Sequence, residues 1–166
     1  MQNNYSIRQF VPLILIFFAI ISVCFALQLA RGSWDLHAGM YDFMGVFFIV
    51  FSAFKIIHLS AFVDAYRTYD IIAQASKTYA YAYPFIEMAL GLAYLLRLAP
   101  VTTNSITALI MFISAYGVLR ALLKKEQIVC ACLGTVFKIP MTSVTLGEDL
   151  LMAGMALWML IQGLII

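Results

Sequence analysis

Long apolar segments separated by short polar connections make up most of the sequence. Five of these segments approach the roughly 20 residues that an α-helix needs to cross the hydrocarbon core of a bilayer. They cover residues 9–29, 43–63, 80–98, 103–123 and 146–166. Because a backbone in hydrocarbon must satisfy its hydrogen bonds internally, each segment is predicted to be a helix. The pattern therefore predicts an all-α protein that crosses the membrane several times.

The composition supports the same fold class. Hydrophobic residues make up 64% of the chain and charged residues only 11%, whereas soluble domains carry roughly 25% charged residues. The mean hydropathy is +0.99. Such a chain cannot cover a soluble domain with polar surface, so we expect the lipid bilayer to be its solvent. The net charge of +2 gives no indication of nucleic-acid binding.

Residues at the segment ends add detail. The first segment is predicted to remain a helix rather than to be cleaved as a signal peptide, because its apolar core is long and only Arg8 precedes it. Tyr79, Tyr81 and Tyr83 precede the main part of the third segment and are expected mostly at the headgroup level. Pro84 is expected in the first turn of that helix, where proline is tolerated.

Two ionisable side chains of opposite sign lie inside the apolar segments. Lys55 lies eight residues before the end of the second segment, and Glu87 lies seven residues after the start of the third. Both are therefore expected roughly 10–12 Å below the same membrane face, which predicts a buried ion pair. His58, one turn closer to that face, joins the predicted cluster. The cluster either fixes the register of two helices or tunes and protonates a functional site.

Glu148 and Asp149 begin the last segment on the same face of the membrane. Acidic residues favour the positive end of a helix, and this structural role is preferred over a catalytic one. With Lys55, His58 and Glu87 they place nearly all intramembrane charge in one half of the bilayer. The opposite half is expected to hold almost no ionisable residue, which predicts a single functional face.

Cys130 and Cys132 stand one residue apart between the fourth and fifth segments, in what we call the cysteine connection. A disulfide between them would close a small, strained ring that exchanges easily. Alternatively, two thiolates can bind a soft ion such as Cu(I), or the pair has no chemical role. Lysines on both sides of the pair favour the thiolate, which is the reactive form. A zinc site is disfavoured because it needs four ligands.

Methionines follow the two cysteines. Met152, Met155 and Met159 share one helical face at positions i, i+3 and i+7, and Met141 lies before them. In the copper alternative, the two cysteines and Met141 are the expected ligands. Packing in a core is nevertheless the more common role of a methionine stripe.

The lysines and arginines of the connections predict the orientation. Seven of them fall on the side of the cysteine connection: Arg8, Arg67, Lys77, Arg120, Lys124, Lys125 and Lys138. Only Arg31 and Arg97 fall on the other side. The positive-inside rule therefore predicts that the N-terminus and the cysteine connection face the cytoplasm.

Several of these residues together resemble a known family. The arrangement of Lys55, the run Tyr83-Pro84-Phe85-Ile86-Glu87 and Gly91 is similar to that of the DoxX-like and methylamine-utilisation MauE membrane proteins. Cys130-Ala131-Cys132-Leu133-Gly134 resembles the Cys-x-Cys-x-Gly segment of the MauE branch. The resemblance extends over residues 43–166 and implies a four-helix transmembrane bundle there, to which residues 1–42 add an N-terminal helix and a polar connection.

The resemblance also implies a function. MauE-like proteins are linked to maturation of the disulfide-rich subunit of methylamine dehydrogenase, beside a thioredoxin-like partner. By resemblance, Cys130 and Cys132 form the redox pair and Gly134 the turn after them, and Lys55 and Glu87 are the matching intramembrane polar positions. We therefore expect a redox accessory protein of the bacterial inner membrane, more than a stand-alone enzyme, that passes electrons or disulfides to a thioredoxin-like partner.

Two other functions stay open at this point. The first is the binding or transport of Cu(I), and only this alternative involves a metal. The second is a subunit of a quinone-linked oxidoreductase, which the DoxX-like relatives suggest but no residue of this chain requires.

Overall fold

A computed structural model describes residues 11–32, 34–124 and 143–165, and for residues 143, 144, 164 and 165 it describes the backbone alone. Cys130, Cys132, Gly134 and Met141 lie outside the described residues. The helices of the described part are α1 (Val11–Arg31), α2 (Leu36–Ile57), α3 (Leu59–Tyr66), α4 (Ile71–Ala75), α5 (Lys77–Leu95), α6 (Pro100–Leu123) and α7 (Ser143–Ile165).

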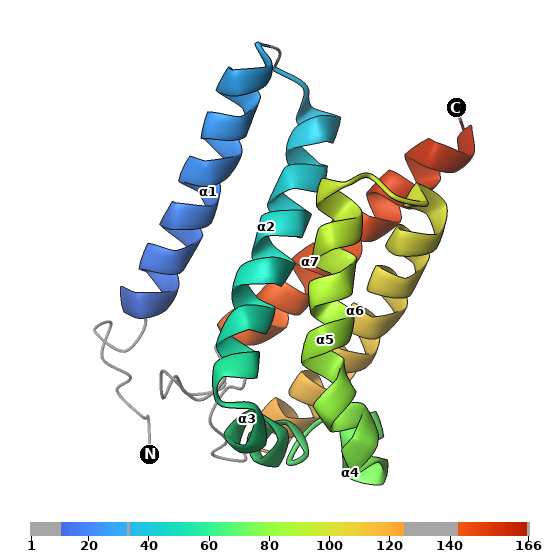
Figure 1. Cartoon of the computed structure of the whole chain (residues 1–166). Helices are drawn as coiled ribbons and strands as arrows, with labels where there is room; N and C mark the ends of the chain where they lie inside the picture. Colours follow the sequence, from blue (N-terminus) through green and yellow to red (C-terminus); the bar gives the residue numbers. More distant parts are fainter. Residues whose placement is uncertain (1–10, 33, 125–142, 166) are drawn as a thin grey trace.

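The long helices form a bundle, and the short helices α3 and α4 lie at one end of it (Figure 1). Helix α2 packs along α5, α6 packs along α7, and α1 lies outside them against α2. The C-terminal end of α6 and the N-terminal end of α7 lie at the same end of the bundle as α3 and α4 (Figure 1). We call this the loop end, because the two helix ends that flank the cysteine connection in the sequence lie there.

The prediction of a helical membrane protein is confirmed, without the detailed arrangement of its spanning helices. Three helices of the described part, α1, α2 and α6, are long and apolar enough to cross a membrane. Helices α5 and α7 have 19 and 23 residues and belong to the same bundle. The arrangement of four spanning helices plus one stays a prediction, as does the division of the chain at residue 42.

The core of the bundle is aromatic and methionine-rich. Phe48, Met44 and Tyr94 are fully buried between α2 and α5, and Met152 and Met159 of α7 are buried in the same cluster. This confirms the packing role predicted for the methionine stripe. On the outside, α1 exposes large apolar side chains, among them Phe18 at 70% exposure, as expected of a helix that faces lipid.

Helix α2 ends earlier than the sequence predicted, at Ile57 instead of near residue 63. His58 has φ −125° and ψ 56°, and the chain continues from it as α3. The apolar run across residues 59–63 is therefore not a continuation of the spanning helix. It supplies Phe62 and Val63, both buried, to a second apolar cluster at the loop end.

Helix α5 begins earlier than predicted, at Lys77, because Ser76 caps it by accepting a hydrogen bond from the Tyr79 backbone N–H at 3.2 Å. Pro84 consequently lies inside the helix and not in its first turn. Since proline has no N–H, α5 lacks one backbone hydrogen bond at this point. The cap decides where the helix starts, and the proline is accommodated within it.

Two glycines allow α2 and α5 to approach closely. A Cβ atom at Gly91 would lie 3.0 Å from the carbonyl oxygen of Gly45, and a Cβ at Gly45 would lie 3.1 Å from the carbonyl oxygen of Gly91. Further along the same interface, Ser52 Oγ lies 3.6 Å from Met88 Sδ. This antiparallel register brings Lys55 of α2 to Glu87 of α5 one turn later.

Candidate functional site: a buried ionic cluster

The ion pair predicted between Lys55 and Glu87 is present. Lys55 Nζ donates to Glu87 Oε1 at 2.6 Å and also to Oε2. The two residues are 6% and 3% exposed. Because α2 ends at Ile57, the pair lies close to the helix end, and α3 rather than further turns of α2 lies beyond it.

Aromatic rings surround the ammonium group of Lys55. Its Nζ lies 5.1 Å from the ring centroid of Tyr83 and 5.7 Å from that of Phe62, distances at which a cation is attracted to the face of a ring. Tyr83 in turn contacts Tyr66, with ring centroids 4.5 Å apart. Tyr83 is therefore a buried wall of the site and not part of an interfacial belt, whereas Tyr81 is exposed and its place at the headgroup level stays a prediction.

A small cavity of about 30 Å³ adjoins the ion pair. Besides Lys55 and Glu87, its polar lining includes Ser114 of α6 and both Glu148 and Asp149 of α7. Ser114 Oγ donates to Asp149 Oδ2 at 2.9 Å. The volume and the polar lining suit a bound water molecule, which needs two to four polar partners.

Glu148 and Asp149 are placed differently from the prediction. Helix α7 begins at Ser143, and its first turn contains no acidic residue. The two acids therefore lie in the second turn, where Glu148 is only 9% exposed. Instead of stabilising a helix end, they join Lys55 and Glu87 in what we call the ionic cluster: Lys55, Glu87, Glu148 and Asp149.

The charges of the ionic cluster do not balance. Three carboxyl groups share one ammonium group, so full ionisation would leave a net charge of −2 around one cavity. Charged groups removed from water are costly unless each is paired and hydrogen-bonded. Such a site favours uptake of protons or of another positive charge, and this is the chemistry that the geometry offers.

His58 does not join the cluster. Its side chain is exposed at the junction of α2 and α3, and it does not line the cavity. The predicted i+3 relation to Lys55 required the helix to continue past residue 58, and α2 ends before it.

Next to the cavity, Asp70 caps helix α4 by accepting a hydrogen bond from the Ala73 backbone N–H at 2.8 Å. Asp70 is fully buried, and burial raises the pKa of its carboxyl group. Burial also raises the pKa of Tyr66, whose ring lines the cavity. This phenol therefore stays protonated and able to donate a hydrogen bond.

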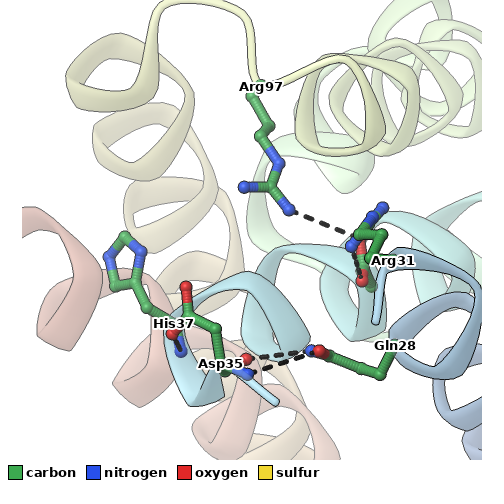
Figure 2. Close-up of polar contacts among 6 residues, drawn as sticks. Gln28, Arg31, Asp35, His37 and Arg97 are labelled. Carbon is green, nitrogen blue, oxygen red and sulfur yellow. Dashed lines mark hydrogen bonds and ion pairs between the residues drawn. The ribbon is translucent and has the colours of Figure 1, made fainter. Parts of the chain in front are cut away.

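A second buried charge lies at the opposite end of the bundle, where almost none was expected. Asp42 is fully buried, Arg31 donates to both of its carboxylate oxygens, and Arg97 lies 4.0 Å away. Figure 2 shows the two arginines converging on this point, with Gln28 bonded to the backbone of Asp35 nearby. The expectation that the opposite half holds almost no ionisable residue was wrong, and the single functional face stays a prediction.

The reason for this error is the start of α2. Asp35 caps the helix by accepting a hydrogen bond from the His37 backbone N–H at 2.9 Å. Asp42 therefore lies within the helix and faces the bundle, not in a solvated connection. The two arginines that were counted only for orientation neutralise it.

The comparisons with known proteins agree with this architecture. The family model "Methylamine utilisation protein MauE" matches residues 33–162, a range that includes the ionic cluster and the cysteine connection. No curated protein and no solved structure matches the chain. Since the family model covers well over half of a helical chain with membrane-length segments, the chain belongs to the MauE family and is a multi-pass membrane protein.

Proposed function

We propose that the protein is a redox-associated accessory protein in methylamine utilisation. In this proposal Cys130 and Cys132 pass electrons or disulfides to a thioredoxin-like partner. The single observation that supports it most is the family match over residues 33–162, because the matched range contains both the cysteine pair and the ionic cluster.

The proposed chemistry is thiol–disulfide exchange. A thiolate of one protein attacks the disulfide of the other, which forms a mixed disulfide and releases one thiolate. The second thiolate of the attacking protein then displaces the remaining sulfur. Two electrons move from the dithiol to the disulfide, so the exchange needs no further oxidant and can run in either direction. Lysines beside Cys130 and Cys132 support the attacking thiolate.

The position of the ionic cluster supports a role in this exchange. Helix α6 ends at Leu123 and α7 begins at Ser143, so the two helix ends that flank the cysteine connection both lie at the loop end. Glu148 and Asp149 lie in the second turn of α7, directly after this connection. A reservoir of protons at this place would serve thiols that change between protonated and ionised forms. His58, exposed at the same end, lies outside the cavity.

The charge distribution supports a cytoplasmic cysteine connection in the inner membrane of a bacterium. At the loop end the described chain carries Arg67, Lys77, Arg120 and Lys124. Arg31 and Arg97 lie together at the other end. The described members of the two groups thus lie at opposite ends of the bundle, and the larger group is on the proposed cytoplasmic side.

The copper alternative has less support. Met152 and Met159 are buried in the core of the bundle, so they do not form an open path of thioether ligands along α7. Cu(I) binding would depend on Cys130, Cys132 and Met141 without this path, and we therefore favour the redox function.

Complementation with cysteine variants tests the proposal. A strain lacking its own copy would be given Cys130→Ser or Cys132→Ser, and growth on methylamine would be measured. Both variants are expected to insert normally and to abolish growth, whereas Cys24→Ser, which removes a half-buried thiol in α1, is the matched control and should behave as wild type. Full growth with the double variant Cys130→Ser/Cys132→Ser would overturn the redox proposal.

A further inference from the structure

Glu148 differs from the other carboxyl groups of the ionic cluster. Its Oε1 atom is buried and has no hydrogen-bond partner among the described residues. Both carboxylate oxygens of Glu87 accept hydrogen bonds from Lys55 Nζ, and Asp149 Oδ2 accepts a hydrogen bond from Ser114 Oγ. A buried carboxylate without a donor is strongly disfavoured relative to the neutral acid.

The groups that surround Glu148 also disfavour its carboxylate form. Lys55 is the one cation among the described residues that line the cavity, and it comes from α2 and is bonded to Glu87 of α5. The other titratable groups lining the cavity are Asp149 of α7 and three phenols, Tyr66, Tyr69 and Tyr83. Helix α6 contributes Ser114 and no titratable group, and the residues of α1 near Glu148 are apolar. The local field therefore opposes a further negative charge at Glu148.

Glu148 also lies between two spaces. It lines the interior cavity, and it lines a groove of about 600 Å³ between α1 and α7. The groove is apolar: Leu13, Phe17 and Ile21 come from α1 and Leu151 from α7. Because α1 exposes apolar side chains outward, this groove faces lipid. One side of the carboxyl group thus meets a polar cavity and the other meets a space that small hydrophobic molecules can enter.

We propose that Glu148 is a proton-binding site, which holds a dissociable proton at neutral pH and exchanges it through the cavity. In the exchange the carboxylic acid gives its proton to a cavity water and becomes a carboxylate, with no other bond changed. Lys55, which lines the same cavity, offers a positive charge to the carboxylate after the proton leaves. The inference does not depend on the thiols and holds whether or not they carry redox chemistry.

Dicyclohexylcarbodiimide provides a direct test, because it is lipid-soluble and adds to protonated carboxyl groups in apolar surroundings. We expect one adduct per chain in membranes, assigned by peptide mass spectrometry to Glu148. The labelled fraction should fall about tenfold per pH unit once the proton dissociates. Glu148→Gln should abolish the adduct, whereas Asp42→Asn, which alters a buried carboxyl group at the opposite end of the bundle, and Cys130→Ser/Cys132→Ser should leave it unchanged.

Infrared spectroscopy gives a second readout that needs no labelling. A protonated carboxyl band that shifts in deuterated buffer and disappears in Glu148→Gln is expected. An adduct elsewhere or absent, labelling independent of pH, or no protonated carboxyl band would each overturn the proposal. These results would leave the thiol proposal untouched, because neither readout involves Cys130 or Cys132.

Discussion

At the scale of single residues, the stability of the buried site depends on how Lys55 is paired with its carboxylate partner. Lys55 is buried and bonded to both oxygens of Glu87, which offsets the cost of removing the two charges from water. Tyr83 and Phe62 add favourable contacts with the ammonium group. Removing one partner would leave the other as an uncompensated buried charge, and this is more costly than removing both.

Replacing Lys55 should therefore destabilise the protein strongly. We expect Lys55→Met to lower the free energy of unfolding by roughly 3–5 kcal/mol, measured by thermal unfolding in detergent. The double variant Lys55→Met/Glu87→Met should recover most of this loss, because no charge stays buried. Lys77→Met, at an exposed position, is the control and should have little effect. A single variant as stable as wild type would show that the pair is not a structural necessity.

Arg97 offers a test in which two effects oppose each other. It has φ 54°, follows the C-terminus of α5, and is 44% exposed in its side chain. A left-handed conformation costs a non-glycine residue roughly 1–2 kcal/mol, while a surface ion pair at 4.0 Å contributes about 1 kcal/mol at most. Arg97→Gly should therefore leave stability unchanged or slightly raised.

Arg31→Met is the informative comparison for Arg97→Gly. Arg31 holds both oxygens of the buried Asp42, so its loss should cost roughly 1–3 kcal/mol. Both variants can be compared in one thermal unfolding series. A greater loss in Arg97→Gly than in Arg31→Met would show that Arg97, and not Arg31, neutralises Asp42.

At the scale of elements, the α2–α5 contact determines the geometry of the ionic cluster. Small residues at helix interfaces let backbones approach closely in membranes, where the hydrophobic effect does not drive helices together. Gly45 and Gly91 serve this purpose, and the register that they permit brings Lys55 to Glu87.

Gly91→Ala should push the two helices apart. The new Cβ would lie 3.0 Å from the backbone of α2, and overpacking of this kind costs roughly 1–3 kcal/mol. Gly154→Ala is the matched control, because a Cβ there meets nothing within 4 Å. It should be neutral or stabilising by up to about 1 kcal/mol, since alanine favours a helix. Equal melting temperatures for the two variants would contradict the close-contact account.

The elements also show what could be predicted from sequence. Apolar length predicted the helical membrane fold, and depth matching predicted the pair of Lys55 and Glu87. What failed were the helix ends: hydropathy runs through His58, where the backbone turns, and it does not register the caps Asp35 and Ser76 that start α2 and α5 early.

The same shift in helix ends accounts for the residues whose surroundings were predicted wrongly. With α2 starting at Leu36, Asp42 turns inward, and with α7 starting at Ser143, Glu148 becomes a cavity residue. An apolar segment indicates that a residue lies in a helix. The direction in which that residue's side chain points follows instead from packing against helices distant in sequence. The pairing of Asp42 with Arg31 and Arg97 depends on such contacts.

At the scale of the whole molecule, the bundle has two charged ends of different character. At one end Arg31 and Arg97 neutralise a single buried Asp42, and this contact has a structural role. At the loop end three carboxyl groups share Lys55, which leaves an excess of acidic groups where α6 ends and α7 begins. This asymmetry favours a protein whose chemistry takes place at the loop end.

The central claim is that Cys130 and Cys132 exchange electrons with a thioredoxin-like protein. The most direct measurement follows the thiols of the detergent-purified protein by alkylation and mass spectrometry, before and after a thioredoxin-like protein is added. We predict a Cys130–Cys132 disulfide that the reduced thioredoxin-like protein opens with matching oxidation of its own dithiol, while Cys24 stays unchanged. Two free thiols that remain reduced in air and exchange nothing with the added protein would contradict the claim.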